Sequence, residues 1–199
     1  MGKNHANVDK YVVSRVRALE SLLLEKGILA PDAVDQVIRR FVEDIGPMLG
    51  ARAVARAWTD PAYKQLLLEN PTAALTEFGL DYQLLQVKEN TPGVHNMVVC
   101  TLCSCYPWAV LGLPPTWYKL PAYRSRAVIE PRAVLREFGL AVTESREIRV
   151  WDSSAELRYM VLPMRPPDTD GLSEADLLPL INRDALIGVA EVRTPATVG

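Results

Sequence analysis

The residues best suited to chemistry are three cysteines that lie close together in the sequence. Cys100, Cys103 and Cys105 are the whole cysteine content of the 199-residue chain. An odd number cannot be fully paired as disulfides, and a reducing compartment would keep the thiols reduced. Thiolates at positions i, i+3 and i+5 of a tight turn can converge on one metal ion, because a C-x-x-C turn is a common chelating geometry. The cluster therefore predicts a metal-binding loop over residues 100–105.

The same residues leave other interpretations open. A structural zinc ion needs four closed ligands, and His95 is the candidate that would complete a Cys₃His site, since His5 lies near a polar terminus. A metal-free redox C-x-x-C pair is a second interpretation, although no thioredoxin-like pattern precedes the motif. A cluster without a role is disfavoured because exposed thiols oxidise. In an open site, soft thiolates favour a transition metal over Mg²⁺ or Ca²⁺, and Ser104 brings its own amide and that of Cys105 close to the metal.

The composition is that of an ordinary globular protein and excludes several classes of function. The chain is 49% hydrophobic and 23% charged, with a net charge of −2. This balance argues against a strongly basic nucleic-acid surface, and no apolar run approaches the about 20 residues of a membrane-spanning helix. The polar N-terminus lacks the apolar core of a signal peptide, and Ala6 stands where myristoylation requires Ser or Thr. We expect a cytoplasmic protein that binds neither nucleic acid nor membranes.

Residues 1–80 are predicted to form a helical N-terminal arm. Apolar residues recur at helical spacing, and Gly and Pro residues punctuate the segments. Helices are expected over residues 9–26, 31–45, 50–57, 60–69 and 72–78. The first two are amphipathic. They either pack on the rest of the chain or wrap around a partner subunit, and the sequence leaves both arrangements open.

Residues 81–199 are predicted to form the catalytic domain that carries the metal loop. Strands are expected over residues 94–99, 147–151 and 157–162, with Asp152-Ser153-Ser154 turning a hairpin between the last two. Four prolines keep residues 106–122 mostly out of regular structure. A proline start and a glycine stop predict a helix over 131–139, and a capping box opens another at Ser173. The predicted fold class is α+β, a helical arm followed by an α/β layered domain.

The cysteine loop and its surroundings resemble the α subunit of nitrile hydratase. The resemblance rests first on Cys100-Thr101-Leu102-Cys103-Ser104-Cys105-Tyr106-Pro107-Trp108. It continues through residues 17–23, 57–61, 89–92, 94–96, 111–119, 123–126, 148–153 and 161–163. It therefore covers nearly the whole chain, and the cysteine motif with its Tyr-Pro-Trp tail is highly specific.

The resemblance implies one low-spin trivalent metal ion per chain. The implied ligands are three cysteine sulfurs and two deprotonated amide nitrogens, supplied by Cys100, Cys103, Ser104 and Cys105. It also implies that Cys103 becomes a sulfinic acid and Cys105 a sulfenic acid. The catalytic residues that the resemblance implies are Cys103, Ser104, Cys105, Gln83 and Trp117. Thr101 favours Co(III), with Fe(III) as the alternative, because Ser is commoner there in iron members. The implied reaction is hydration of a small-molecule nitrile to its amide, with the C≡N group polarised at the open metal position.

Partners and pocket residues follow from the same resemblance. A β subunit, or β-like chains, should supply arginines to the oxidised cysteines, and an activator or metallochaperone should load the metal. Trp117 would line the substrate pocket, with ordinary packing as the alternative. The segment Gly79–Lys88 is shorter than its counterpart in the family, so Gln83 is the candidate for the family's glutamine near the site, and the accompanying glutamate has no clear counterpart. The missing bulk predicts a larger nitrile, such as a nucleoside nitrile of the toyocamycin kind.

Two other functions remain open at this point. A relative, the catalytic subunit of thiocyanate hydrolase, shares the Cys-Thr-Leu-Cys-Ser-Cys loop and would release carbonyl sulfide and ammonia. A non-catalytic, zinc-stabilised interaction module would instead carry zinc and unmodified cysteines. A metal-carrier or assembly role is a further alternative.

Overall fold

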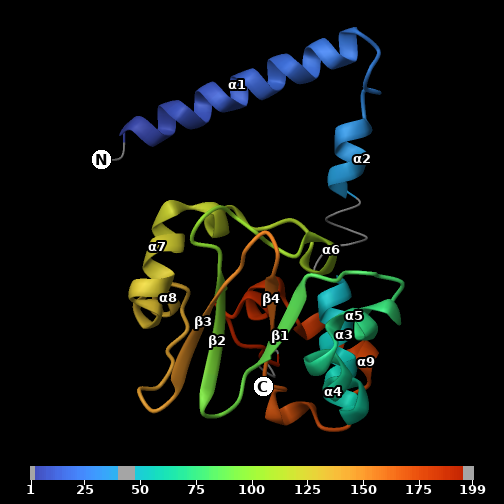
Figure 1. The fold of residues 1–199 in the computed structure, drawn as a ribbon, viewed down its shortest axis with the longest axis vertical. Coiled ribbons are helices and arrows are strands. Elements are labelled where there is room, and N and C mark those ends of the chain that lie inside the picture. Colours follow the sequence, from blue (N-terminus) through green and yellow to red (C-terminus); the bar gives the residue numbers. More distant parts are fainter. Residues whose placement is uncertain (1–2, 40–47, 195–199) are drawn as a thin grey trace, which may run out of the picture. The chain divides into compact units, whose positions relative to one another are not determined.

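The structure, a computed structural model, describes residues 3–39 and 48–194 of the chain. By its internal contacts the chain divides into two units, Met1–Arg40 and Phe41–Gly199 (Figure 1). Within the described ranges, no helix combines the length and the apolar character needed to cross a bilayer.

The first unit contains the two expected amphipathic helices. Helix α1 spans Lys3–Glu25 and begins earlier than predicted, and α2 spans Ala33–Arg39. Gly27 ends the first helix with a positive φ of 66°, and its N–H donates to the carbonyl of Leu24. This left-handed closure is the one that glycine adopts most readily. The predicted continuation of the second helix to residue 45 lies outside the described residues.

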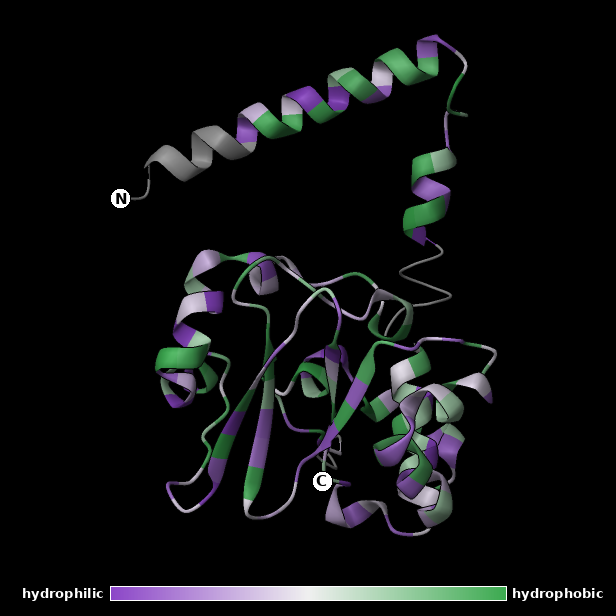
Figure 2. Cartoon of the chain, viewed as in Figure 1, coloured by the Kyte–Doolittle hydropathy of each residue, from purple (hydrophilic) through white to green (hydrophobic). Residues whose placement is uncertain are grey.

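Helix α1 leaves its apolar side chains uncovered within its own unit. Val12, Val16 and Leu19 are 50%, 56% and 58% exposed. Figure 2 shows apolar and polar bands alternating along this helix. An amphipathic helix of this kind gains most of its stability in proteins from packing its apolar face, so the exposed face is available to another surface.

The second unit mixes helices with two small parallel sheets. Strand β1 (Leu85–Glu89) pairs with β4 (Arg158–Leu162), and β2 (Val94–Val99) pairs with β3 (Glu147–Asp152). The helices of this unit are α3 (Met48–Thr59), α4 (Pro61–Glu69), α5 (Pro71–Thr76), α6 (Trp108–Leu111), α7 (Pro121–Ile129), α8 (Pro131–Glu137), α9 (Glu174–Leu177) and α10 (Arg183–Ile187). Short 3₁₀ helices span Thr116–Lys119, Pro167–Thr169 and Leu178–Leu180. The predicted α+β class is confirmed.

The strands over 94–99, 147–152 and 158–162 are confirmed, but the expected hairpin between β3 and β4 is wrong. Strand β3 pairs in parallel with β2, and β4 pairs in parallel with β1, so β3 and β4 do not pair with each other. Strands β2 and β4 bury most of their residues, so their backbone N–H and C=O groups need partners along the strand. Strands β3 and β1 provide these partners, and the chain after Asp152 passes from one pair to the other.

Helices cover both sides of the strands (Figure 1). Helices α4 and α5 contact β1, whereas α7 contacts β2 and α8 contacts β3. Helices α3, α4 and α5, which the sequence places in the arm before residue 80, thus lie in the same unit as the strands. Helix α7 was not predicted from the sequence, because it begins at Pro121, within the proline-rich segment that was expected to lack regular structure.

Helix α10 ends against strand β2 at a position that only glycine fits. Gly188 has a φ of +88°, and a Cβ added there would lie 2.0 Å from the carbonyl oxygen of Asn96. The buried His95 donates from Nε2 to the carbonyl of Gly188 at 2.7 Å. This contact therefore fixes the middle of β2, the strand that leads into the cysteine loop.

A Gly188→Ala substitution should destabilise the fold much more than Gly139→Ala. Gly139 also has a positive φ, of 81°, but no atom lies within 4 Å of its added Cβ. We expect Gly139→Ala to lower the free energy of unfolding by about 1 kcal/mol. Gly188→Ala adds a backbone clash and should cost at least about 3 kcal/mol. Urea denaturation of both variants measures the difference, and equal losses would contradict this packing.

Candidate metal centre

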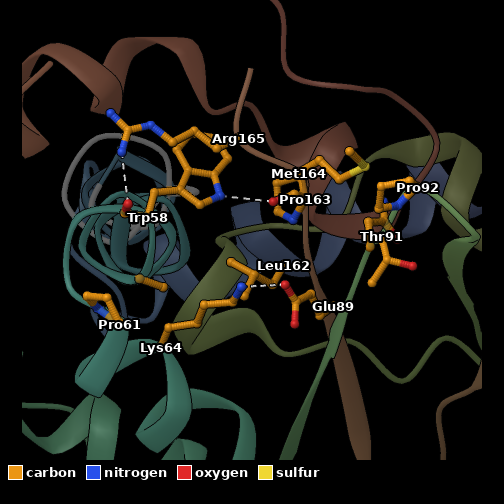
Figure 3. Close-up of a pocket in the computed structure, with 12 residues that line it drawn as sticks. Trp58, Pro61, Lys64, Glu89, Thr91, Pro92, Leu162, Pro163, Met164 and Arg165 are labelled. Atoms are coloured by element: carbon orange, nitrogen blue, oxygen red, sulfur yellow. Dashed lines mark hydrogen bonds and ion pairs between the residues drawn. The ribbon is translucent and has the colours of Figure 1, made fainter. Parts of the chain in front are cut away.

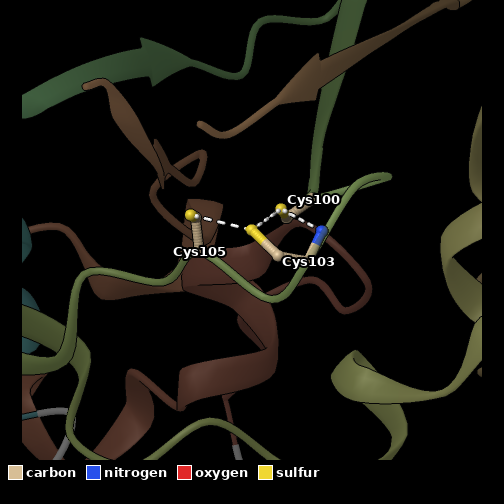
Figure 4. Close-up of side chains that lie close together, drawn as sticks. All are labelled: Cys100, Cys103 and Cys105. Atoms are coloured by element: carbon tan, nitrogen blue, oxygen red, sulfur yellow. Dashed lines mark hydrogen bonds between the residues drawn. The ribbon is translucent and has the colours of Figure 1, made fainter. Parts of the chain in front are cut away.

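The three cysteines meet in a loop directly after strand β2 (Figure 4). The sulfur of Cys103 lies 3.3 Å from that of Cys100 and 3.1 Å from that of Cys105. Cys100 is buried, Cys105 is half-buried and Cys103 is exposed. All three thiols are free, and their sulfurs lie within 4.8 Å of one another. The predicted convergence of the cluster is thus present in the fold.

Three side chains from other elements hold the backbone of this loop. Asp152, at the end of β3, accepts from the N–H of Thr101 at 2.9 Å and from its hydroxyl at 2.6 Å. The hydroxyl of Tyr118 donates to the carbonyl of Cys105 at 3.1 Å. Arg124 on α7 donates to the carbonyl of Cys103. The loop is therefore fixed near its start, middle and end.

Neither Asp152 nor Tyr118 was predicted from the sequence to contact the cysteine loop. The parallel register pairs Val99 with Asp152, so the two strands end side by side and the carboxylate reaches the first peptide of the loop. Tyr118 lies in a 3₁₀ helix within the proline-rich segment and is fully buried. Recognising that β3 pairs with β2 would have been enough to find Asp152.

The local environment gives the thiols of Cys103 and Cys105 very different pKa values. Hydrogen bonds from the side chains of Cys105 and Cys100 lower the pKa of the Cys103 thiol to about 7. Burial, together with the contact to Cys103, raises the pKa of Cys105 to about 12. Because the thiolate is the form that reacts and binds metals, the exposed Cys103 is more reactive than Cys105 in a metal-free chain.

Iodoacetamide should therefore modify Cys103 first in the metal-free protein. A pKa of about 7 means that its thiolate forms as the pH rises through 7 rather than through the usual value near 9. Peptide mass analysis after short exposure should find the label at Cys103, and the labelling rate should fall below pH 7. The Cys103→Ser variant is the control and should react slowly. Equal labelling of Cys105 would contradict the assignment.

The donor set fits a transition metal. Each cysteine offers one sulfur, and thiolates prefer such ions over Mg²⁺ and Ca²⁺. Among the side chains that the structure describes, no histidine or carboxylate joins the group. Three side-chain ligands are fewer than a closed structural zinc site needs, so positions are left for backbone groups and a further ligand.

His95 does not complete a Cys₃His site. It is fully buried as the second residue of β2, and its Nε2 donates to the carbonyl of Gly188. Its Nδ1 lies 3.5 Å from the side-chain nitrogen of Asn90. Both ring nitrogens therefore face groups other than the cysteines. The side chain of His5 lies outside the described residues.

The other predicted site residues lie in different surroundings. Ser104 is half-buried between Cys103 and Cys105, as its place in the loop requires. Trp117 is half-buried in an aromatic cluster, with its ring 4.8 Å from that of Tyr123 and 4.7 Å from that of Phe138. Gln83 is exposed in the segment before β1. The catalytic roles of Trp117 and Gln83 stay predictions.

A hollow in the surface lies at the end of strand β2 that is opposite to the cysteine loop (Figure 3). It has a volume of about 410 Å³ and contains none of the three cysteines. The indole of Trp58 donates to the carbonyl of Pro163 at 2.9 Å, and Lys64 pairs with Glu89 at 2.5 Å. Residues from the turn before β2 line this hollow, whereas the cysteine loop follows the strand. It is therefore separate from the candidate metal centre.

Comparison with known proteins identifies the family. A family model described as "Nitrile hydratase, alpha chain" matches residues 10–190. The chain belongs to the nitrile hydratase α-chain family.

Relatives of this nitrile hydratase α chain include both cobalt and iron proteins. It is 54% identical over 188 residues to the low-molecular weight cobalt-containing nitrile hydratase subunit alpha of Rhodococcus rhodochrous, covering 93% of this chain and 91% of that one. It is 51% identical to the cobalt-containing subunit alpha of Pseudonocardia thermophila, covering 94% of each. A double mutant of the Fe-type nitrile hydratase from Comamonas testosteroni Ni1 superposes with a TM-score of 0.86 at 41% identity, covering 96% and 97% of the two chains.

Thiocyanate hydrolase is a more distant relative. Its subunit gamma from Thiobacillus thioparus is 43% identical over 195 residues, covering 91% of this chain and 80% of that subunit. The higher identity to nitrile hydratase subunits favours nitrile hydratase over thiocyanate hydrolase. Membership of this enzyme family also disfavours a non-catalytic zinc module.

Proposed function

We propose that this chain is the catalytic α subunit of a heteromeric nitrile hydratase, a lyase that adds water to a nitrile to give the amide. The observation that carries the proposal is the convergence of three sulfurs within 4.8 Å, in a chain that the family model matches over residues 10–190. No other cluster of three or more histidine, cysteine or carboxylate side chains of this kind occurs in the described part of the chain.

The loop residues would hold one cobalt ion per chain. The sulfurs of Cys100, Cys103 and Cys105 are the side-chain ligands, and the amide nitrogens of Ser104 and Cys105 complete the protein's contribution. Three thiolates and two anionic amides carry enough negative charge to favour a trivalent ion. Thr101 and the cobalt-containing relatives support Co(III) over Fe(III). The chemistry that such an ion supplies when bound is Lewis-acid polarisation of the C≡N bond.

The rest of the site orients the loop and shapes the space for the substrate. Asp152 and Tyr118 hold the backbone at the two ends of the loop through the hydrogen bonds described above. We assign Trp117 to the wall of the nitrile pocket and Gln83 to its mouth. Cys103 as a sulfinic acid and Cys105 as a sulfenic acid would present oxygen atoms beside the nitrile carbon.

The site requires a partner chain. Oxidised cysteines are anionic and need charge-assisted donors, which a β subunit would supply as arginines, and an activator or metallochaperone would load the cobalt. The exposed apolar residues Val12, Val16 and Leu19 support the arrangement in which α1 packs on that partner. We place the enzyme in the cytoplasm, where three free cysteines stay reduced until the metal is bound.

Coexpression with a β-type partner in cobalt-supplemented medium tests the function. The purified complex should hold about one cobalt ion per chain, gain the mass of about three oxygen atoms, and convert a nitrile to its amide. Cys105→Ala should lose cobalt and at least about a thousandfold in activity. Ser125→Ala, an exposed change on α7, is the control and should keep both.

Three results would overturn this function. One zinc ion with unmodified cysteines would indicate a structural module. Carbonyl sulfide from thiocyanate, without amide from nitriles, would indicate thiocyanate hydrolase, which is the second candidate because of its 43% identity. Full activity in Cys105→Ala would exclude the loop from the reaction.

The short segment Gly79–Lys88 supports a bulky substrate. We expect kcat/KM for a heteroaromatic nitrile to exceed that for acetonitrile by about tenfold, since the added contacts of a ring in a fitted pocket are worth that much. Product formation with each nitrile, measured on the same complex, gives the ratio. Equal values would contradict the prediction and leave the hydration reaction itself untouched.

A further inference from the structure

Arg124 touches the cysteine loop from inside the chain. It lies on α7 and donates through Nη1 to the carbonyl oxygen of Cys103. It also lines a hollow of about 360 Å³ beside the loop, together with Thr101. Its neighbour Tyr123 is buried and donates to the carbonyl of Val98 at 2.7 Å. Two consecutive residues of one helix thus hold the end of β2 and the middle of the loop.

The carbonyl that Arg124 binds belongs to a particular peptide group. The oxygen of Cys103 and the nitrogen of Ser104 are the two ends of one planar, conjugated unit. In the proposed function the nitrogen of Ser104 is an anionic metal ligand, and conjugation shares its negative charge with the oxygen. A guanidinium on that oxygen forms a charge-assisted hydrogen bond, which is about twice as strong as a neutral one.

The charge of Arg124 is not used elsewhere in the described residues. No carboxylate forms an ion pair with it there, and its Nε is buried without a hydrogen-bond partner. Arg126, two residues further along the same helix, pairs with both Glu130 and Glu137 at 2.5 Å. Burying a guanidinium nitrogen without a hydrogen-bond partner costs free energy, and a favourable interaction elsewhere on the same side chain has to offset this cost. The cysteine loop is the structure that Arg124 contacts.

We propose that Arg124 is a positioning residue that stabilises the metal-bound form of the Cys103–Ser104 peptide. This inference rests on the proposed function. The positive charge of Arg124 balances part of the negative charge of the loop from within the α chain, independently of any arginine from a partner. Because α7 is bonded to β2 through Tyr123, the guanidinium is in place before the metal binds.

Cobalt retention in the complete, coexpressed complex tests the proposal. Arg124→Gln removes the charge, and Arg124→Lys keeps it on a single nitrogen without the planar fork. Arg126→Gln is the matched control, since it removes a charge from the same helix and breaks the ion pairs to Glu130 and Glu137 without touching the loop. The readouts are cobalt per chain, the rate of cobalt loss to a chelator, and the sulfur-to-cobalt charge-transfer absorption.

We expect cobalt loss to be faster than in the control by about tenfold in Arg124→Gln and about threefold in Arg124→Lys, with a shifted absorption band. Circular dichroism checks that each complex is folded. If Arg124→Gln does not fold, Arg124→Lys decides the question. A folded variant that retains cobalt and absorbs like Arg126→Gln overturns the proposal. If the wild-type complex itself holds no cobalt, the proposed function fails instead.

Discussion

The parallel pairing of β2 with β3 determines where the cysteines lie. The register brings Val99 beside Asp152, and the N–H of Ser153 donates to the carbonyl of Val99 at 2.7 Å. The chain therefore leaves β2 at a fixed point, next to a carboxylate that captures both the N–H and the hydroxyl of Thr101. A shift of one residue in this register would turn Asp152 to the other face and release the start of the loop.

In the thiolate form that binds a metal, the three cysteines of the loop would concentrate negative charge in a small volume. Three sulfurs lie within 4.8 Å of one another, and as thiolates they repel each other unless a cation lies between them. Arg124 places a positive charge beside the cysteine loop. In the described part of the chain, no carboxylate forms an ion pair with this guanidinium. In the proposed function, the α subunit would hold the metal with its own residues and would need a partner to neutralise the oxidised sulfurs.

Local spacing predicted the chemistry better than it predicted the topology. The i, i+3, i+5 spacing predicted the cysteine cluster, and the apolar run before it predicted strand β2. Both features depend only on residues that are close in the sequence. Asp152 and Arg124 reach the loop only through the pairing of β3 with β2 and the packing of α7 on β2. The expected hairpin after Asp152 was wrong because two short strands with a turn between them look the same whether they pair together or with earlier strands.

X-ray absorption at the metal edge of the purified complex tests most directly whether the loop is an open site. We predict about three sulfur scatterers with additional nitrogen or oxygen neighbours around cobalt, in a coordination number above four. A four-coordinate zinc spectrum with a closed ligand shell, or a complex that hydrates nitriles without any metal, would contradict it.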